Sequence, residues 1–187
     1  LALYVSSVSR KAFFVLLLAY LLSLAVRAPH VGRPLSAHHE FCSALVLIFL
    51  ENWRDGGFAE HKGCPASNFP GAADRYVYPE SYAFATSNGV FYYLSHTPLS
   101  YYLPHLLFTL SGTAPNATGL TLFNLFFHFT TALLLFRVLR ITLTRDDPSD
   151  LPRLPLAGAL FYLFMPAPLW LHGNAYMADM FVQNLWA

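Results

Sequence analysis

A stretch of eighteen residues, "GLTLFNLFFHFTTALLLF" from Gly119 to Phe136, decides the class of fold that this sequence adopts. It contains no Asp, Glu, Lys or Arg, and it approaches the roughly 20 apolar residues with which a helix crosses a bilayer. The whole chain is 56% hydrophobic and only 11% charged, whereas a soluble domain carries about a quarter charged residues. The sequence therefore predicts an all-α, polytopic membrane protein.

Two other apolar runs indicate that the chain crosses the membrane several times. They are "AFFVLLLAYLLSLAV" and "LPLAGALFYLFMPAPLWL". The chain starts without Met and stops inside a new apolar run, so we expect the N-terminal part of one transmembrane domain of a longer protein. With flanking residues included, the predicted spans are about 12–31, 119–136 and 154–171, with the start of a further span at about 180–187.

Basic residues predict how these spans are oriented. Arg10 and Lys11 precede the first span, and four arginines lie in the segment 137–153 between the second and third spans. Loops rich in Lys and Arg stay in the cytoplasm. Both basic segments lie on one side only if "PLSYYLPHLLFTL", residues 98–110, does not cross. This run is short and contains a proline, so we predict an interfacial helix, with residues of about 32–117 forming one large non-cytoplasmic loop.

Two local signals stand out in this outer loop. The segment 37–53 is strongly apolar and is followed by "RDGG", so we predict a helix that ends there. Asn88-Gly89, between β-favouring residues, predicts a tight β-hairpin. Asp179 follows the third span, and so returns to the membrane face that carries Glu40.

An ionisable cluster, His38-His39-Glu40, stands near the start of the predicted helix and has two interpretations. It is either an interfacial polar cap, or Glu40 is a working carboxylate that Asp179 joins at the outer face. A zinc metalloprotease helix is excluded, because the H-E-x-x-H pattern would need a histidine at Ser43. A metal site made of His39, Glu40 and Asp179 stays open, as does a plain helix-capping role for Asp179.

Other polar residues also have two interpretations. Asn124 and His128 share one face of the second span, where they either hydrogen-bond between helices or line a ligand pathway. His96 precedes the interfacial helix, and Tyr101 and Tyr102 lie within it. These three residues suit a lipid phosphate headgroup and the headgroup zone around it, and the alternative is a plain re-entrant or surface helix.

Three segments in order carry a resemblance to a known family: "GRPLSAHHEFCSALVLIFLENW", "YYLSHTPLSYYLPHLLFTLSG" and "LFYLFMPAPLWLHGNAYMADMF". The chain resembles the N-terminal part of C-type (GT-C) membrane glycosyltransferases, in particular the lipid A aminoarabinose transferase and dolichyl-phosphate-mannose protein mannosyltransferase group. The family's Asp-Glu pair corresponds to His39-Glu40, and its Asp-Met pair corresponds to Asp179-Met180. His96 stands where the family has a lysine before its Pro-Leu-Tyr-Tyr motif.

The resemblance implies a GT-C-like transmembrane bundle with a large outer loop of interfacial helices and a short β-hairpin. It also implies an inverting transfer of a sugar from a polyprenyl-phosphate donor to an acceptor hydroxyl. The acceptor would be a lipid, a glycan or a protein on the non-cytoplasmic face of the plasma (inner) membrane, and membrane lipids would be further partners.

The resemblance also assigns roles to particular residues. Glu40 would take the proton from the acceptor hydroxyl. Asp179 would orient the acceptor or help to bind a divalent metal, which is an optional cofactor. The donor-side residues would be His96, Arg75 and Arg33 for the phosphate and Tyr101 and Tyr102 for the lipid.

A non-enzymatic polytopic membrane protein, either a transporter subunit or an assembly factor, is the alternative. A transporter concentrates ionisable groups near the bilayer midplane, whereas here the charges gather at one surface. The net charge of +1 without a basic tract argues against a nucleic-acid partner. Two cysteines are too few for a disulfide framework or a cysteine-built zinc site.

Overall fold

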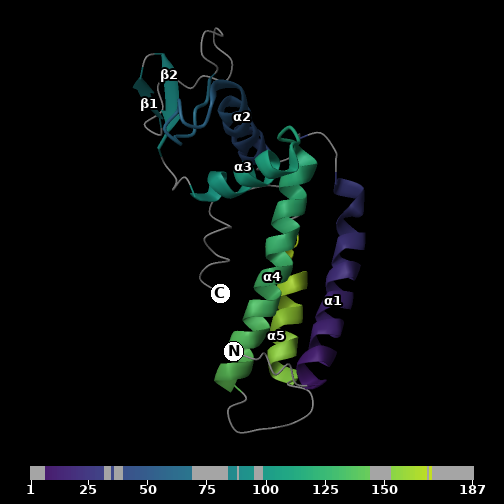
Figure 1. Ribbon diagram of the computed structural model, residues 1–187. Coiled ribbons are helices and arrows are strands. Elements are labelled where there is room, and N and C mark those ends of the chain that lie inside the picture. Colours follow the sequence, from purple (N-terminus) through teal and green to yellow (C-terminus); the bar gives the residue numbers. More distant parts are fainter. Residues whose placement is uncertain are drawn as a thin grey trace. The chain divides into compact units, whose positions relative to one another are not determined.

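The computed structural model is mostly helical, and its described residues form two compact units (Figure 1). It describes residues 7–31, 35, 40–68, 84–87, 89–94, 99–143, 153–167 and 169. Unit 1 contains α1 (Ser7–Arg27), η1 (Ala28–His30), α4 (Ala117–Leu143) from residue 124 onward, and α5 (Arg153–Phe164). Unit 2 contains α2 (Glu40–Gly56), β1 (Phe84–Ser87), β2 (Val90–Tyr93), α3 (Leu99–Ser111) and the first two turns of α4.

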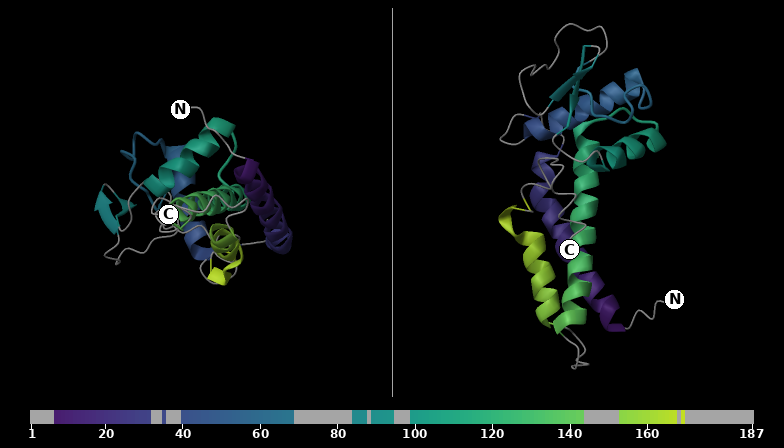
Figure 2. Two further views of the ribbon diagram at one scale, coloured as in Figure 1. Left: turned by 90° about the horizontal axis from the view of Figure 1, so that it is seen from below. Right: turned by 90° about the vertical axis from the view of Figure 1, so that its left-hand side faces the viewer.

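In unit 1 the helices α1, α4 and α5 pack side by side (Figure 2). Their core is built from small and large apolar side chains: Ala12, Leu16, Ala132, Phe136, Leu156, Ala159 and Leu163. Residues from the first half of α1 meet residues from the second half of α4, so the two helices are antiparallel. The basic start of α1 therefore lies at the same end of unit 1 as the end of α4.

Among the described residues, two helices are long and apolar enough to cross a membrane. They cover residues 10–30 and 117–143, which confirms the helices predicted for the first and second spans. The second helix continues past Phe136 to Leu143, so the prediction that a loop begins at Arg137 was wrong. No Gly or Pro interrupts this extension, and arginines near a helix C-terminus interact favourably with its dipole.

The third apolar run forms a shorter helix than predicted. α5 ends at Phe164 and covers 12 residues, fewer than the roughly 20 that span a bilayer. Pro166 explains the interruption, because proline has no N–H to continue the helical ladder. The N–H of Leu169 donates to the carbonyl of Met165 at 2.9 Å, so a helical turn follows the break. The further span predicted at about 180–187 lies outside the described residues.

Unit 2 is organised around α2. This helix ends at Gly56, and Gly57 takes the left-handed conformation (φ 91°) that glycine adopts without strain. The predicted helix and its end at the two glycines are therefore confirmed over the described range. The core of unit 2 combines residues of α2, α3 and α4: Val46, Phe49, Leu50, Trp53, Tyr101, Phe108 and Leu120.

The predicted hairpin is also present in unit 2. β1 and β2 are antiparallel, and Ser87 pairs with Val90, so two residues form the turn. Gly89 has φ 76°, which tight hairpin turns require. On the other edge of β2, the N–H of Tyr93 donates to the carbonyl of Pro65 at 2.8 Å. The segment after α2 therefore ties the hairpin to that helix.

α3 matches the predicted interfacial helix in its bounds, and its end is fixed against α4. Gly112 (φ 65°) terminates α3, and the N–H of Thr113 donates back to the carbonyl of Phe108 at 3.2 Å. Asn116 then caps α4, because its Oδ1 accepts the N–H of Gly119 at 2.8 Å. The ring of Phe108 lies so close to Gly119 that a Cβ there would approach it to 2.6 Å.

Candidate functional site

Glu40, the predicted base, is the first residue of α2 and is only 2% exposed. Ser43, in the same turn of the helix, is buried as well. The N–H groups of a helix's first turn favour a negative charge beside them. A buried carboxylate is expensive unless the protein supplies such stabilisation. The fold therefore holds this acid in a fixed, protein-lined position.

The remaining predicted polar site residues lie outside the described residues; they are His39, His96, Arg33, Arg75 and Asp179. The pairing of Glu40 with Asp179 and the phosphate contacts thus stay predictions. Within the described part of the chain, no group of three His, Cys, Asp or Glu side chains is placed to share a metal ion. Two of the three predicted metal ligands are not among the residues searched, so the metal site also stays a prediction.

The two predicted lipid-binding tyrosines lie in different surroundings. Tyr101 is buried, and its ring meets that of Phe49 edge-on with 5.4 Å between centroids. Tyr102 is half-buried and packs on Trp53 at 5.7 Å. Its hydroxyl would lie 2.8 Å from a Cβ at Gly63, so only glycine fits there without displacing it. Both tyrosines thus face protein, and the opposite side of α3 is left for other contacts.

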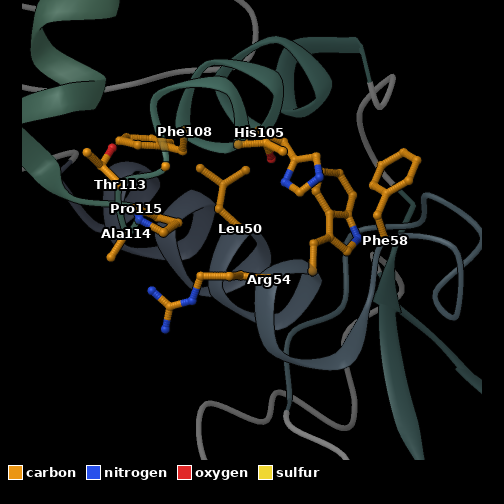
Figure 3. A pocket seen from close by; sticks show the side chains of 11 residues that line it. Leu50, Arg54, Phe58, His105, Phe108, Thr113, Ala114 and Pro115 are labelled. Carbon is orange, nitrogen blue, oxygen red and sulfur yellow. The ribbon is translucent and has the colours of Figure 1, made fainter.

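A pocket of about 550 Å³ lies between α2, α3 and the loop that joins α3 to α4 (Figure 3). This volume is within the usual range for small-molecule sites. Leu50 and Trp53 come from α2, and Phe108 comes from α3. The complete lining is Leu50, Trp53, Arg54, Phe58, His105, Phe108, Thr109, Gly112, Thr113, Ala114 and Pro115.

His105 supplies the pocket with a neutral polar group. Its ring stacks on Phe58 with 5.1 Å between centroids and an interplanar angle of 12°, and it meets Trp53 edge-on at 5.3 Å. Burial lowers the pKa of His105, so the imidazole is uncharged at neutral pH. A neutral imidazole offers one donor and one acceptor. Figure 3 shows this ring at the edge of the pocket.

Arg54 supplies the only charged side chain among the lining residues, and this charge is already neutralised. Its Nη2 lies 2.6 Å from a carboxylate oxygen of Glu51, and its Nε donates to Asp55 at 2.9 Å. The hydrogen bond to Asp55 raises the pKa of Arg54, while burial raises the pKa of Glu51. One cation between two acids gives no excess positive charge. The pocket thus favours a neutral and largely apolar ligand.

Sequence reasoning missed this pocket because its lining comes from segments far apart in the chain. The available signal was local: Trp53 and Phe58 flank the glycine pair that ends α2. Aromatic residues on both sides of a sharp turn meet when the chain reverses. The ring centroids of Trp53 and Phe58 are indeed 5.0 Å apart.

Sequence reasoning also missed Arg27 in unit 1, because it resembles an ordinary basic flank of an apolar run. The side chain is only 4% exposed. Its Nε donates to the carbonyl of Leu169 at 2.9 Å, its Nη1 donates to Ser23 Oγ at 3.0 Å, and its Nη2 lies 2.9 Å from His128 Nδ1. Arginine only donates, so Nδ1 is the acceptor and the ring proton of His128 is on Nε2.

This cluster bears on the two interpretations of Asn124 and His128. Both side chains are buried, and His128 contacts Arg27 of another helix, as the helix-packing interpretation of His128 predicts. The described residues of unit 1 include no Asp or Glu. Arg27 therefore keeps its charge among neutral acceptors, which marks it as an unusual group inside a bundle of apolar helices.

No known protein family, curated protein or solved structure matches this chain.

Proposed function

We propose that the protein is a multi-pass membrane glycosyltransferase of the GT-C type, which moves a sugar from a polyprenyl-phosphate donor to an acceptor hydroxyl. The observation that carries the proposal is the burial of Glu40 at the start of α2, in the unit that also contains α3 and the pocket. Burial fixes the position of this side chain. A general base requires a carboxylate that is held within hydrogen-bond reach of the proton that it accepts.

The arrangement of unit 1 supports a site on the non-cytoplasmic side of the plasma (inner) membrane. The antiparallel packing of α1 and α4 brings Arg10 and Lys11 to the same end as Arg137 and Arg140. By the positive-inside tendency, that end is cytoplasmic. The chain then leaves α1, and enters α4, at the opposite end. The segment between them, which contains Glu40, lies outside the cytoplasm.

In the proposed reaction, Glu40 accepts the proton of the acceptor hydroxyl while the oxygen of that hydroxyl bonds to the anomeric carbon of the sugar. The bond from that carbon to the donor phosphate oxygen breaks with inversion, and polyprenyl phosphate leaves. His96, Arg75 and Arg33 are proposed to stabilise the negative charge on the leaving phosphate. Asp179 is proposed to orient the acceptor, and a divalent metal held with His39 is an optional addition.

The experiment compares Glu40→Gln with Glu51→Gln in the intact protein, reconstituted in lipid vesicles with polyprenyl-phosphate sugars. Glu51 is a matched control because it belongs to the same helix but is partly exposed and pairs with Arg54. We expect Glu40→Gln to lose about 10²–10⁴-fold in turnover, as for a lost general base, and Glu51→Gln to stay near the native rate. Turnover of Glu40→Gln within about tenfold of native would remove Glu40 from this role.

A transporter subunit is a second candidate function, and Arg27 is the observation that favours it. A buried cation beside His128, among helices long enough to span, is typical of ion and substrate pathways. Uptake of inorganic phosphate into vesicles, lost in Arg27→Gln but kept in Glu40→Gln, would support this function. Sugar transfer lost in Glu40→Gln would support the transferase.

A further inference from the structure

The pocket between α2 and α3 lies far from Glu40 along the same helix. Glu40 is the first residue of α2, whereas Leu50, Trp53 and Arg54 of this helix line the pocket (Figure 3). Leu50 and Arg54 follow Glu40 by ten and fourteen residues, which corresponds to about 15–20 Å along a helix axis. A general base works only within hydrogen-bond reach of its proton. A small molecule held in the pocket therefore does not reach Glu40.

The floor of the pocket is apolar and disfavours a sugar. Leu50, Trp53 and Phe108 line it, and each of these side chains is at most 4% exposed. Phe58 and His105 pack against Trp53 with 5.0 and 5.3 Å between ring centroids, so little of the indole is open for a sugar ring to stack on. A sugar carries hydroxyl groups on most of its carbons. Against this floor they would lose their hydrogen bonds to water without replacement.

The charged groups beside the pocket disfavour an ionised ligand. Arg54 lies between Glu51 and Asp55, so these three side chains together carry one more negative charge than positive charges. This excess repels an anion such as a lipid phosphate. A cation would meet the guanidinium itself, because Arg54 lines the pocket and the two acids do not. An apolar floor adds a desolvation cost for either kind of ion.

Two uncharged polar side chains of α3, His105 and Thr109, also line the pocket. A neutral imidazole offers one donor and one acceptor, and a hydroxyl group can act as either. Both therefore suit a hydroxyl group on the ligand. The volume of about 550 Å³ fits one drug-sized molecule. A compact ring system fits it whole, whereas a lipid with two acyl chains would leave most of its length outside.

We propose that this pocket is a second binding site, separate from Glu40, for a compact, uncharged ring compound that carries a hydroxyl group. The apolar body of the ligand contacts Leu50 and Phe108, and its hydroxyl group hydrogen-bonds to His105. The site takes neither a sugar nor a lipid phosphate, so it is distinct from the sites for both substrates of the proposed transfer. The inference does not depend on that reaction, because no residue that lines the pocket has a role in it.

Quenching of Trp53 fluorescence by brominated ligands tests this assignment in the intact protein in detergent micelles, with Trp170 and Trp186 changed to phenylalanine. Bromine quenches an indole only at short range, so the signal reports ligand beside Trp53. The probe is bromonaphthol, which is uncharged at neutral pH. Bromonaphthoate and bromonaphthylmethylammonium present the same rings with a negative or a positive charge, and bromonaphthalene lacks the hydroxyl group.

Three variants locate the ligand. Thr109→Phe and Ala114→Phe fill the pocket from two of its walls, and either one suffices if the other does not fold. Leu110→Phe is the matched control, because Leu110 belongs to α3 but does not line the pocket. Glu40→Gln reports whether binding is separate from the proposed base.

We expect bromonaphthol to quench Trp53 saturably, and both charged analogues to bind about tenfold more weakly or worse. Bromonaphthalene should bind about two- to tenfold more weakly, because it lacks one hydrogen bond. Quenching should disappear in Thr109→Phe and Ala114→Phe and persist in Leu110→Phe and Glu40→Gln.

Other results would overturn the assignment. Absent quenching by bromonaphthol, or equal quenching by a charged analogue, would overturn the class of ligand. Quenching that persists in both pocket-filling variants, or is lost in Leu110→Phe, would overturn the site. Quenching lost in Glu40→Gln would overturn the separation from Glu40. A Glu40→Gln protein that keeps both quenching and native sugar transfer would refute the proposed base and support this site.

Discussion

The contact of Phe108 with Gly119 makes a quantitative prediction about the junction of α3 and α4. A methyl group at position 119 would lie 2.6 and 2.7 Å from two ring carbons of Phe108, whereas carbon atoms in contact normally stay about 3.5–4.0 Å apart. The ring must therefore move by about 1 Å. Phe108 is buried against the core of unit 2, so this movement disturbs packed neighbours, which costs about 1–3 kcal/mol.

A helical Gly→Ala change also brings a gain of up to about 1 kcal/mol from helix propensity. With the packing cost taken at the middle of its range, about 2 kcal/mol, we expect Gly119→Ala to lower the free energy of unfolding by about 1–2 kcal/mol in total. For a chain of this size, that corresponds to about 2–8 °C in the midpoint of thermal unfolding. Near-ultraviolet circular dichroism in detergent micelles would measure the change, because the core of unit 2 is rich in aromatic rings.

Gly158 in α5 provides the matched control. A Cβ there would lie 2.6 Å from a single terminal methyl group of Leu139. This side chain is only half-buried, so it can turn away at a cost of about 0.5–1.5 kcal/mol. The propensity gain offsets that cost, and we expect Gly158→Ala to be close to neutral. A Gly119→Ala protein as stable as the native one, or less affected than Gly158→Ala, would refute the reasoning.

Three further predictions concern buried polar groups. Burial lowers the pKa of His61 and His105 below the ordinary 6.5. The unfolded chain therefore binds more protons than the folded one as pH falls below about 6.5. The stability that is present above this pH should be lost as pH falls toward the lowered pKa of the folded state. Denaturant titrations would give the free energy of unfolding at each pH, and its dependence on pH should be weaker in His61→Gln and His105→Gln. An unchanged dependence would contradict the lowered pKa of these histidines. Trp53→Phe removes the hydrogen bond from Nε1 to the carbonyl of Cys64 at 2.8 Å, which should cost about 1–3 kcal/mol in denaturant unfolding; a loss of only a few tenths would show that water replaces the indole. In Arg27→Lys, one compact ammonium group replaces the guanidinium and cannot reach all three acceptors of Arg27. The midpoint of thermal unfolding in detergent should therefore fall by several degrees. An unchanged midpoint would mean that the guanidinium is not needed for stability.

Local signals in the sequence predicted the elements of the fold well. Long apolar runs without charge predicted α1 and α4, and the glycine pair after Asp55 predicted where α2 ends. Gly89 predicted the hairpin, because its left-handed conformation is a property of single residues. The bounds of α3 were also predicted from its own composition, a short apolar run that contains a proline. Each of these signals depends on residues that are neighbours in the chain.

The errors in element bounds occurred where two tendencies competed. Arginine was interpreted as the beginning of a loop at position 137, but a long side chain continues a helix easily while its charge reaches water. Pro166 was included in an apolar run, although it interrupts the ladder of hydrogen bonds. Hydropathy identified both segments and did not determine where their helices end.

The candidate site was less accessible to sequence reasoning than the fold. The burial of Glu40 depends on how α2 packs, which periodicity alone does not give. The pocket brings Trp53 together with His105, 52 positions further along the chain. Arg27 finds His128 across 101 positions. Such contacts arise from tertiary packing, and a single sequence carries no direct record of them.

The partners of Arg27 have a consequence for how the protein is made. Two of its three acceptors lie 101 and 142 positions later in the chain, so neither exists when the ribosome has just released α1. If α1 crosses the membrane, as proposed, the guanidinium has to snorkel into the headgroup layer during that interval. Only the arrival of α4 and of the turn at Leu169 provides acceptors that let it withdraw from water. The first helix therefore reaches its final packed position late in biogenesis, although it is synthesised first.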